Sequence, residues 1–224
     1  MIDSQQTVAG LVLDHSECAP VFQQHRIDFC CRGGVSIAEA ARARGMEPDA
    51  LIAALSQAIE ARRGDRAVDA RSLTTPQLVA HIVARHHAYL RTALPFVGGL
   101  AAKVARVHGD HNPKLRELQS AVDALVVALL PHLDEEETVL FPALVAPAVD
   151  RAVAEKGLGA MRDEHLAVAL LLERVRVASD DFALPAWACN SYRALFSELE
   201  QVEGDTFTHV HLENHVLKPR FVEA

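Results

Sequence analysis

A short motif occurs twice in this chain, as His132-x-x-x-Glu136 and as His209-x-x-x-Glu213. Residues four apart project from the same face of an α-helix, so each copy can present a nitrogen and a carboxylate to one metal centre. Imidazole with bridging carboxylate suits iron, and less selectively zinc or manganese. A single copy is also typical of a surface hydrogen bond. Two copies on two helices of one bundle predict a shared metal site.

The composition favours helices throughout. Half of the 224 residues are hydrophobic, whereas aromatic residues make up only 5%. Strands favour β-branched and aromatic residues, while Ala and Leu, which are abundant here, favour helices. No segment of the sequence alternates as a strand does. The predicted fold class is all-α, an antiparallel four-helix bundle preceded by a small helical domain.

Breaks in the helical pattern divide the chain. We predict a small helical domain at residues 1–62, a linker at 63–74, where the sequence is charged and poorly periodic, and the bundle at 75–224. Prolines and turn residues give the approximate limits of the helices in the bundle. These limits are 75–107, 112–144, 158–178, and 185 to just before Pro219. Pro95 and Gly98-Gly99 are expected to bend the first of these helices.

The other ligands follow from the geometry of antiparallel helices. A turn near residue 110 places His132 about 22 residues beyond it, and His87 lies a similar distance before it. The only histidine between positions 132 and 209 is His165, which makes it the partner of His209. Four imidazoles and two carboxylates from four helices suit a di-iron site with bridging glutamates. The predicted ligand set is His87, His132, Glu136, His165, His209 and Glu213.

Other histidines are left out of this set. His108 follows His87 by 21 residues, which is roughly 31 Å along a straight helix, so both cannot reach one metal pair unless the chain folds back. His86 faces about 100° away from His87 on a helix, and we expect it at the surface. Four other histidines of the bundle segment are expected at the surface or behind the ligands: His81, His111, His211 and His215.

The four cysteines do not form a disulfide framework, and Cys30 and Cys31 are adjacent. Adjacent thiols just before glycines can be exposed, and thiolate is the form that binds iron or nitric oxide. The alternative is that the pair fills a small core as buried residues. Cys18 and Cys189 are expected to be core residues.

Charge and hydropathy exclude some partners. A net charge of −8 argues against nucleic acid, whose phosphates require clustered Lys and Arg. No apolar stretch approaches the roughly 18–20 residues that span a bilayer, and no signal-peptide pattern is present, so we expect no membrane association and a cytoplasmic location.

Several longer motifs resemble the repair-of-iron-centres family, whose members restore iron–sulfur clusters after nitrosative or oxidative damage. The amino-terminal motif is Ile27-Asp28-Phe29-Cys30-Cys31 followed by glycines. The bundle motifs are the segments 81–87, 103–108, 132–137, 140–142, 164–165 and 209–214. The resemblance spans nearly the whole chain, and neither hemerythrin oxygen carriers nor ferritins have the Cys-Cys domain.

The resemblance implies a hemerythrin-like bundle that holds two non-haem irons, a cysteine-bearing domain in front of it, and a role in stress repair. The six residues chosen above match the family's iron ligands, and Cys30 with Cys31 matches its reactive thiol pair. Three positions depart from the family pattern: Arg32 between the cysteines and the glycines, Ala128 where relatives can be acidic, and Lys218 before Pro219.

Three functions remain open at this point. The first is repair of damaged clusters by iron donation or nitric oxide removal, and the second is enzymatic reduction of nitric oxide or peroxide at the same centre. The third is an O2 or nitric oxide carrier or sensor, for which the thiols have no use. The expected partners are damaged iron–sulfur proteins as iron acceptors and nitric oxide or O2 as small ligands. The oligomeric state stays open, a homodimer included.

Overall fold

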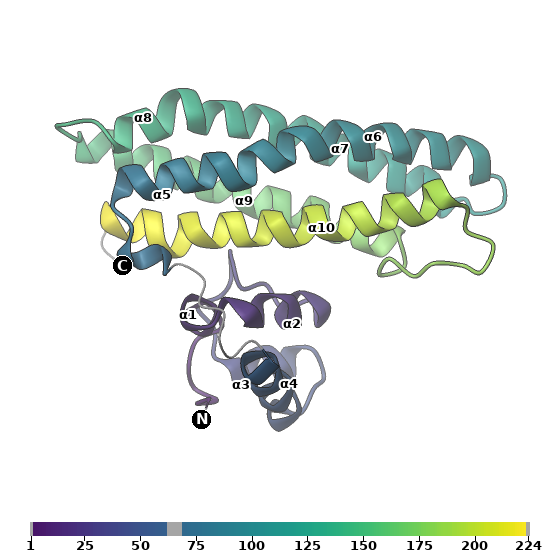
Figure 1. Cartoon of the computed structure of the whole chain (residues 1–224), viewed down its shortest axis with the longest axis horizontal. Coiled ribbons are helices and arrows are strands. Elements are labelled where there is room, and N and C mark those ends of the chain that lie inside the picture. Colours follow the sequence, from purple (N-terminus) through teal and green to yellow (C-terminus); the bar gives the residue numbers. More distant parts are fainter. Residues whose placement is uncertain (1, 62–68, 223–224) are drawn as a thin grey trace. The chain divides into compact units, whose positions relative to one another are not determined.

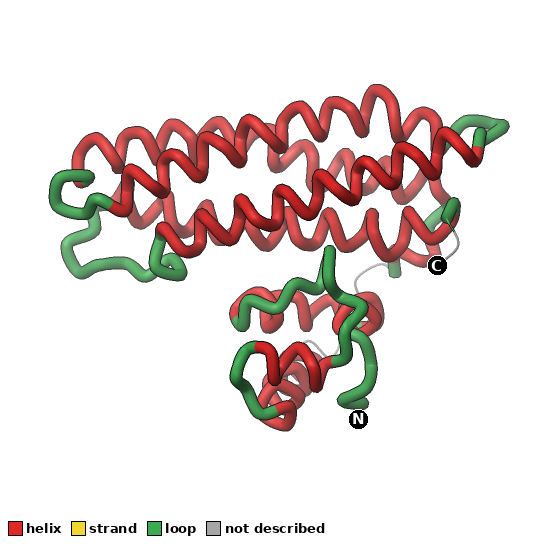
Figure 2. Tube along the Cα trace, turned by 180° about the vertical axis from the view of Figure 1, so that it is seen from behind, coloured by secondary structure: helices red, strands yellow, loops and turns green. Residues whose placement is uncertain are grey.

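The computed structural model describes residues 2–61 and 69–222. Within these ranges the regular structure is helical, apart from one isolated bridge between Thr7 and Ser36 (Figure 2). The predicted all-α class is confirmed. No helix in the described part of the chain is both long enough and apolar enough to cross a membrane.

The chain divides into two compact units. The first unit combines Met1–Thr74 with Phe207–Ala224, and the second is Thr75–Thr206. Of the predicted linker, residues 63–68 lie outside the described residues. The boundary at Thr75 is where the sequence places the start of the bundle, whereas the grouping of the last 18 residues with the amino-terminal segment is not apparent from the sequence.

The second unit consists of long helices that run side by side (Figure 1). Its helices are α5 (Thr75–Ile82), α6 (Ala88–His108), α7 (Lys114–Glu135), α8 (Phe141–Leu144), α9 (Arg151–Ala178) and the first part of α10 (Asn190–Leu212). A π-helical turn, Val83–His87, joins α5 to α6, and a second, Glu136–Leu140, joins α7 to α8. The middle helix α7 packs against both α6 and α9.

The sequence of α7 explains which side chains enter the bundle core. Val122, Leu125 and Leu129 recur every three or four positions and are buried, which is the spacing of an apolar stripe on one helix face. The same spacing continues to His132 and Glu136. These two polar residues are also buried, which costs free energy unless polar partners or a metal ion compensate.

The third bundle helix begins earlier than predicted. α9 starts at Arg151 and not near Leu158, because the Asp150 side chain accepts hydrogen bonds from the amides of Ala152 and Val153 and caps the helix. Gly157 lies inside α9 although glycine disfavours helices. Here a Cβ at Gly157 would lie 2.8 Å from Leu140 Cδ1, so the glycine lets α9 approach the π-helical turn closely.

The first unit is a group of short helices with its own core. Its helices are α1 (Val8–Asp14), α2 (Ala19–Gln24), α3 (Ile37–Ala43) and α4 (Pro48–Ala61), with single 3-10 turns at Ser16–Cys18, Ala70–Ser72 and Lys218–Arg220. Thr7 caps α1, and Ser36 with Glu39 forms a capping box at α3. Pro48 is the first residue of α4, where the fixed φ of proline suits a helix start.

Residues from the carboxy-terminal segment complete this small core. Phe29 is buried, and its ring centroid lies 6.4 Å from that of Phe22, 5.9 Å from that of Phe207 and 5.5 Å from that of His211. Val210 belongs to the same buried cluster. The amino-terminal helices alone are close to the lower size limit for independent folding, and the end of α10 adds apolar surface to their core.

Candidate metal centre

Three histidines from three helical segments converge on Glu136. Its Oε1 lies 3.3 Å from Nε2 of His132 and 3.8 Å from Nε2 of His165, and its Oε2 lies 3.4 Å from Nε2 of His87. All four side chains are buried. A carboxylate with imidazoles beside both of its oxygens could hold a metal ion together with them.

The separations of these donor atoms fit a metal ion better than direct hydrogen bonds. They exceed the usual N–H···O range of about 2.7–3.2 Å. With bonds of about 2.1 Å to the metal, two donors at right or tetrahedral angles lie about 3.0–3.4 Å apart, which includes the separations of Glu136 from His132 and His87. The 3.8 Å separation from His165 corresponds to a wider angle of about 130°. In addition, Nε2 of His132 is buried and makes no hydrogen bond to any described residue. The donor set therefore fits a metal bound by nitrogen and oxygen.

Carboxylates behind two of the histidines set their ring orientation. Nδ1 of His132 donates to Glu164 Oε2 at 2.6 Å, and Nδ1 of His87 donates to Glu137 Oε1 at 2.9 Å. A proton on Nδ1 leaves the Nε2 lone pair for a metal, which is the usual carboxylate–histidine–metal arrangement. The sequence reasoning did not find these two carboxylates, although each directly adjoins a ligand in the sequence, Glu136 or His165.

Glu137 is held in its charged form. It accepts hydrogen bonds from Nη2 of Arg91 at 3.0 Å and from His87. Burial alone would raise the pKa of Glu137, but these hydrogen bonds and the nearby positive charge outweigh it, and the pKa lies below its ordinary value. Arg91 in turn pairs with Asp134 at 2.7 Å. The carboxylate behind His87 thus stays ionised at neutral pH.

These contacts predict the effect of removing either carboxylate. We expect Glu137→Gln or Glu164→Gln to weaken metal binding by about 10–100-fold, the usual cost of losing such a partner, because the imidazole loses its orientation and basicity. Competition with a chelator measures this affinity, and Glu135→Gln, at an exposed neighbouring position, serves as the control. Unchanged affinity in both variants would show that the carboxylates do not position the histidines.

Three candidate ligands lie in π-helical turns. His87 ends the turn Val83–His87, Glu136 begins Glu136–Leu140, and Glu213 begins Glu213–Leu217. A π-helical turn inserts an extra residue into an α-helix, shifts the register of the side chains that follow, and is frequent at functional sites. Pro95 and Gly98-Gly99, the predicted bend, lie within the α-helical span of α6. The bend itself stays a prediction, and the change from π-helical to α-helical geometry before α6 falls at His87.

The second His-x-x-x-Glu motif lies at the end of α10. Nε2 of His209 is 2.8 Å from Oε1 of Glu213, and both side chains are fully buried. Val202 and Thr206 precede them at intervals of four and three residues and are buried in the bundle unit. The helical register therefore places His209 on the same face of α10 as these two core residues.

Two of the remaining histidines are buried. His86 is buried and not at the surface, because its Nδ1 bonds to Asp205 Oδ1 at 2.9 Å. His211 is also buried, and its Nδ1 donates to the backbone oxygen of Phe29 at 3.2 Å. Burial and the neighbouring His215 lower the pKa of His211 to about 4, so its ring is neutral at physiological pH.

His108, at the end of α6, packs against Cys189 and Trp187. Its Nε2 lies 3.2 Å from Sγ of Cys189, and its ring packs beside Trp187. Cys189 is exposed, contrary to the predicted core position, whereas Cys18 is buried as predicted. His81 and His111 are exposed, as expected.

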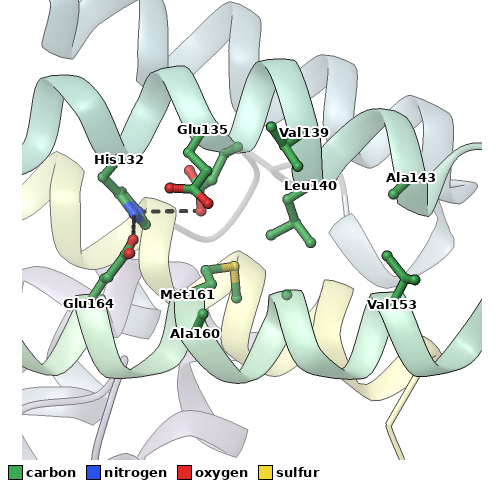
Figure 3. A pocket seen from close by; sticks show the side chains of 11 residues that line it. His132, Glu135, Val139, Leu140, Ala143, Val153, Ala160, Met161 and Glu164 are labelled. Carbon is green, nitrogen blue, oxygen red and sulfur yellow. Dashed lines mark hydrogen bonds and ion pairs between the residues drawn. The ribbon is translucent and has the colours of Figure 1, made fainter.

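A pocket reaches the metal-binding side chains from the outside. It has a volume of about 80 Å³ and is lined by His132, Glu136 and Glu164 on its polar side and by apolar residues that include Val139, Leu140 and Met161. Figure 3 shows His132 and Glu164 pointing toward one another from facing helices. One water needs about 10–15 Å³ of such space, so the pocket has room for several waters or a diatomic molecule.

The cysteine pair occupies a turn organised by Asp28. Oδ1 of Asp28 accepts from the amides of Cys30 and Cys31, at 3.1 and 2.8 Å, and from Sγ of Cys30 at 3.2 Å. Both cysteines are free thiols, with Cys31 partly exposed. Cys30 is buried in the small core, which is the alternative that the sequence left open, and burial foremost raises the pKa of its thiol well above the ordinary value. The Cys30 thiol is therefore protonated at neutral pH unless a metal replaces its proton.

The end of α10 and the turn after it hold the backbone of this cysteine pair. The carbonyl oxygen of Cys30 accepts from Nδ2 of Asn214 at 3.1 Å and from Nε2 of His215 at 2.9 Å. Both donors belong to the π-helical turn that begins with Glu213. A candidate iron ligand and the side chains that fix the thiol turn thus share one turn of helix.

Comparison with known families gives the class of protein. Residues 78–221 match the family described as the hemerythrin HHE cation binding domain, and residues 4–59 match ScdA_N, a domain of unknown function (DUF542). The first match covers more than half of the chain. The fold and the histidine and carboxylate donors thus define a cation-binding bundle of the hemerythrin class.

Relatives that match nearly the whole chain identify the family within this class. The chain is 31% identical over 223 residues to the iron-sulfur cluster repair protein ScdA of Staphylococcus haemolyticus (strain JCSC1435). This match covers 99% of the present chain and 100% of the relative. The chain is 32% identical over 218 residues to the iron-sulfur cluster repair proteins YtfE of Yersinia pseudotuberculosis (strain PB1/+) and Yersinia pestis (strain Pestoides F), covering 96% of each chain. The chain belongs to this family of iron–sulfur cluster repair proteins.

Proposed function

We propose that the chain is a di-iron protein that repairs damaged iron–sulfur clusters. In this proposal the two irons are held by His87, His132, Glu136, His165, His209 and Glu213. The observation that carries it is the convergence of three buried imidazoles on the two oxygens of Glu136, at separations suited to metal ligation. Glu213, buried beside His209, supplies a second carboxylate of the same kind.

The donor chemistry supports iron over its competitors. Four imidazoles and two carboxylates suit iron, whereas a structural zinc site usually contains cysteine and closes at four ligands. When bound, a pair of irons supplies redox chemistry and coordination positions for a small ligand. The protein's own residues orient the imidazoles through Glu137 and Glu164 and keep bulk solvent away by burying the ligands.

The names of the relatives and the thiol pair support repair. Relatives that match nearly the whole chain are described as iron–sulfur cluster repair proteins. In addition to the bundle, the chain has Cys30 and Cys31, whose thiols lie 3.6 Å apart. We propose that these thiols handle iron or nitric oxide during repair, that damaged iron–sulfur proteins in the cytoplasm are the partners, and that nitric oxide or O2 binds as a small ligand.

Reduction of nitric oxide at the same centre is the alternative function. The pocket of about 80 Å³ beside His132 favours it, because apolar walls that lead to metal ligands suit a small, weakly polar molecule. Steady-state consumption of nitric oxide by the iron-loaded protein, compared with reactivation of a damaged cluster enzyme, separates the two functions. Reactivation of the cluster enzyme without consumption of nitric oxide supports iron donation. Consumption of nitric oxide without reactivation supports the reductase.

The thiols give a direct test of the repair function. We expect Cys31→Ser to leave the bundle iron content unchanged, because nitrogen and oxygen atoms supply its ligands, while reactivation of a nitrosylated cluster enzyme falls at least several-fold. Iron analysis and the repair assay are run on the same preparation, with Cys189→Ser at an exposed site as the control. Repair at the wild-type rate in the Cys31 variant would make the pair structural.

A further inference from the structure

Besides the bundle centre, one other group in the first unit brings three metal-binding atoms together. Asp28, Cys30 and Cys31 each offer one ligand atom, and these atoms lie within 4.8 Å of one another. We propose that this group is a separate metal site for a thiophilic divalent cation, with two sulfur ligands and one carboxylate oxygen. Its occupant during repair is ferrous iron in transit, a role that rests on the proposed function, whereas the site itself does not.

The sulfur atoms are spaced as a metal requires. Sγ of Cys30 and Sγ of Cys31 are 3.6 Å apart, too far for a disulfide, whose sulfurs lie about 2.05 Å apart. With metal–sulfur bonds of about 2.3 Å, this separation corresponds to a sulfur–metal–sulfur angle of about 103°, close to tetrahedral. The turn therefore already holds both thiols near the positions of two ligands on one ion.

The carboxylate completes a three-donor face. Oδ1 of Asp28 is 3.2 Å from Sγ of Cys30 and accepts a hydrogen bond from its thiol. With a metal–oxygen bond of about 2.1 Å, this separation gives an oxygen–metal–sulfur angle of about 95°. A divalent cation that replaced both thiol protons would meet two thiolates and the Asp28 carboxylate, so three negative charges would face its two positive ones. Atoms balance as two protons leave the thiols when the metal enters.

The surroundings keep the site rigid and leave one side open. The backbone carbonyl of Cys30 is fixed by Asn214 and His215, so the turn is organised before a metal arrives. Asp28 and Cys31 are partly exposed, which gives a cation access to the otherwise buried Cys30. Three ligands with an open fourth position suit a site that passes its metal to an acceptor, because a closed four-ligand site holds metal structurally.

Cobalt(II) tests the site in the full-length, iron-loaded protein. Thiolate bound to cobalt gives sulfur-to-metal charge-transfer absorption, which nitrogen and oxygen ligands do not give. We expect anaerobic titration to add one cobalt per chain with this absorption, and Cys30→Ser with Cys31→Ser to abolish it. Cys189→Ser, the exposed control, should leave it unchanged. Absence of the band in the wild type, or its persistence in the double variant, overturns the site.

Asp28→Asn tests the carboxylate separately from the turn. The amide oxygen of asparagine can still accept from the two backbone amides, so the turn is retained while the anionic ligand is lost. We expect cobalt affinity to fall at least ten-fold with an unchanged circular dichroism spectrum, and equal affinity would remove Asp28 from the site. Because cobalt binding needs no cluster repair, a chain that binds cobalt without repairing refutes the proposed function alone. Repair without cobalt binding refutes this site alone.

Discussion

Glu136→Ala is expected to remove both irons from the bundle. The two oxygens of Glu136 face imidazoles on both sides, His87 on one and His132 with His165 on the other. Loss of a bridging ligand should therefore cost more than the about 10–100-fold in affinity that follows loss of an outer carboxylate. Metal analysis after purification in the presence of ferrous iron measures this effect.

Glu135→Ala is the matched control for this variant. Glu135 is adjacent in sequence but exposed, so its removal changes the same region's charge by the same amount. Circular dichroism should be alike for the two variants, because iron and not the bundle fold is lost. Two irons retained in the Glu136 variant would contradict the proposed role of this carboxylate.

Glu203→Ala is expected to destabilise the bundle unit by about 3–5 kcal/mol. Glu203 accepts hydrogen bonds from Nε of Arg176, at 2.8 Å, and from its Nη2, and both side chains are more than nine-tenths buried. Truncation leaves the guanidinium in the core without its main counter-charge. Urea unfolding followed by circular dichroism measures the loss, and Glu200→Ala, at an exposed position of the same helix, should change stability little.

A double variant tests the cause of this loss. Arg176→Met with Glu203→Leu removes both charges and keeps apolar volume, and such replacements of buried ion pairs are often neutral or stabilising. The double variant should therefore be more stable than Glu203→Ala alone. A double variant as unstable as the single one would mean that packing and not the unpaired charge causes the loss.

The helices and the donors on α7 could be predicted from the sequence because local periodicity encodes them. The stripe Val122, Leu125 and Leu129 continues at the same spacing to His132 and Glu136, so the motif had to lie on the buried face. His87 lies beside Glu136, as the antiparallel hairpin predicts, and His165, which the sequence paired with His209, also lies beside Glu136. The complete set of six ligands remains a prediction.

The π-helical turns could not be predicted, because the extra residue that each one contains depends on packing between helices and not on local propensity. Gly157 illustrates the same point: glycine disfavours helices, but close contact with Leu140 accounts for it inside α9.

Burial of single side chains was also decided by distant partners. His86 is buried because Asp205, 119 residues away in sequence, accepts its hydrogen bond. Cys30 is buried in a core that includes Val210 from the carboxy-terminal segment. Neither partner has a local sequence signal. A single sequence therefore does not predict which side chains such long-range partners bury.

Low-temperature Mössbauer spectroscopy of the oxidised wild-type protein, loaded with 57Fe, tests the central claim most directly. The proposed centre predicts two high-spin ferric ions per chain, coupled antiferromagnetically through bridging carboxylate, so that the ground state is diamagnetic. Iron analysis of the same sample should give two irons per chain. One iron per chain, or a magnetically isolated ferric ion, would contradict a di-iron centre built on Glu136.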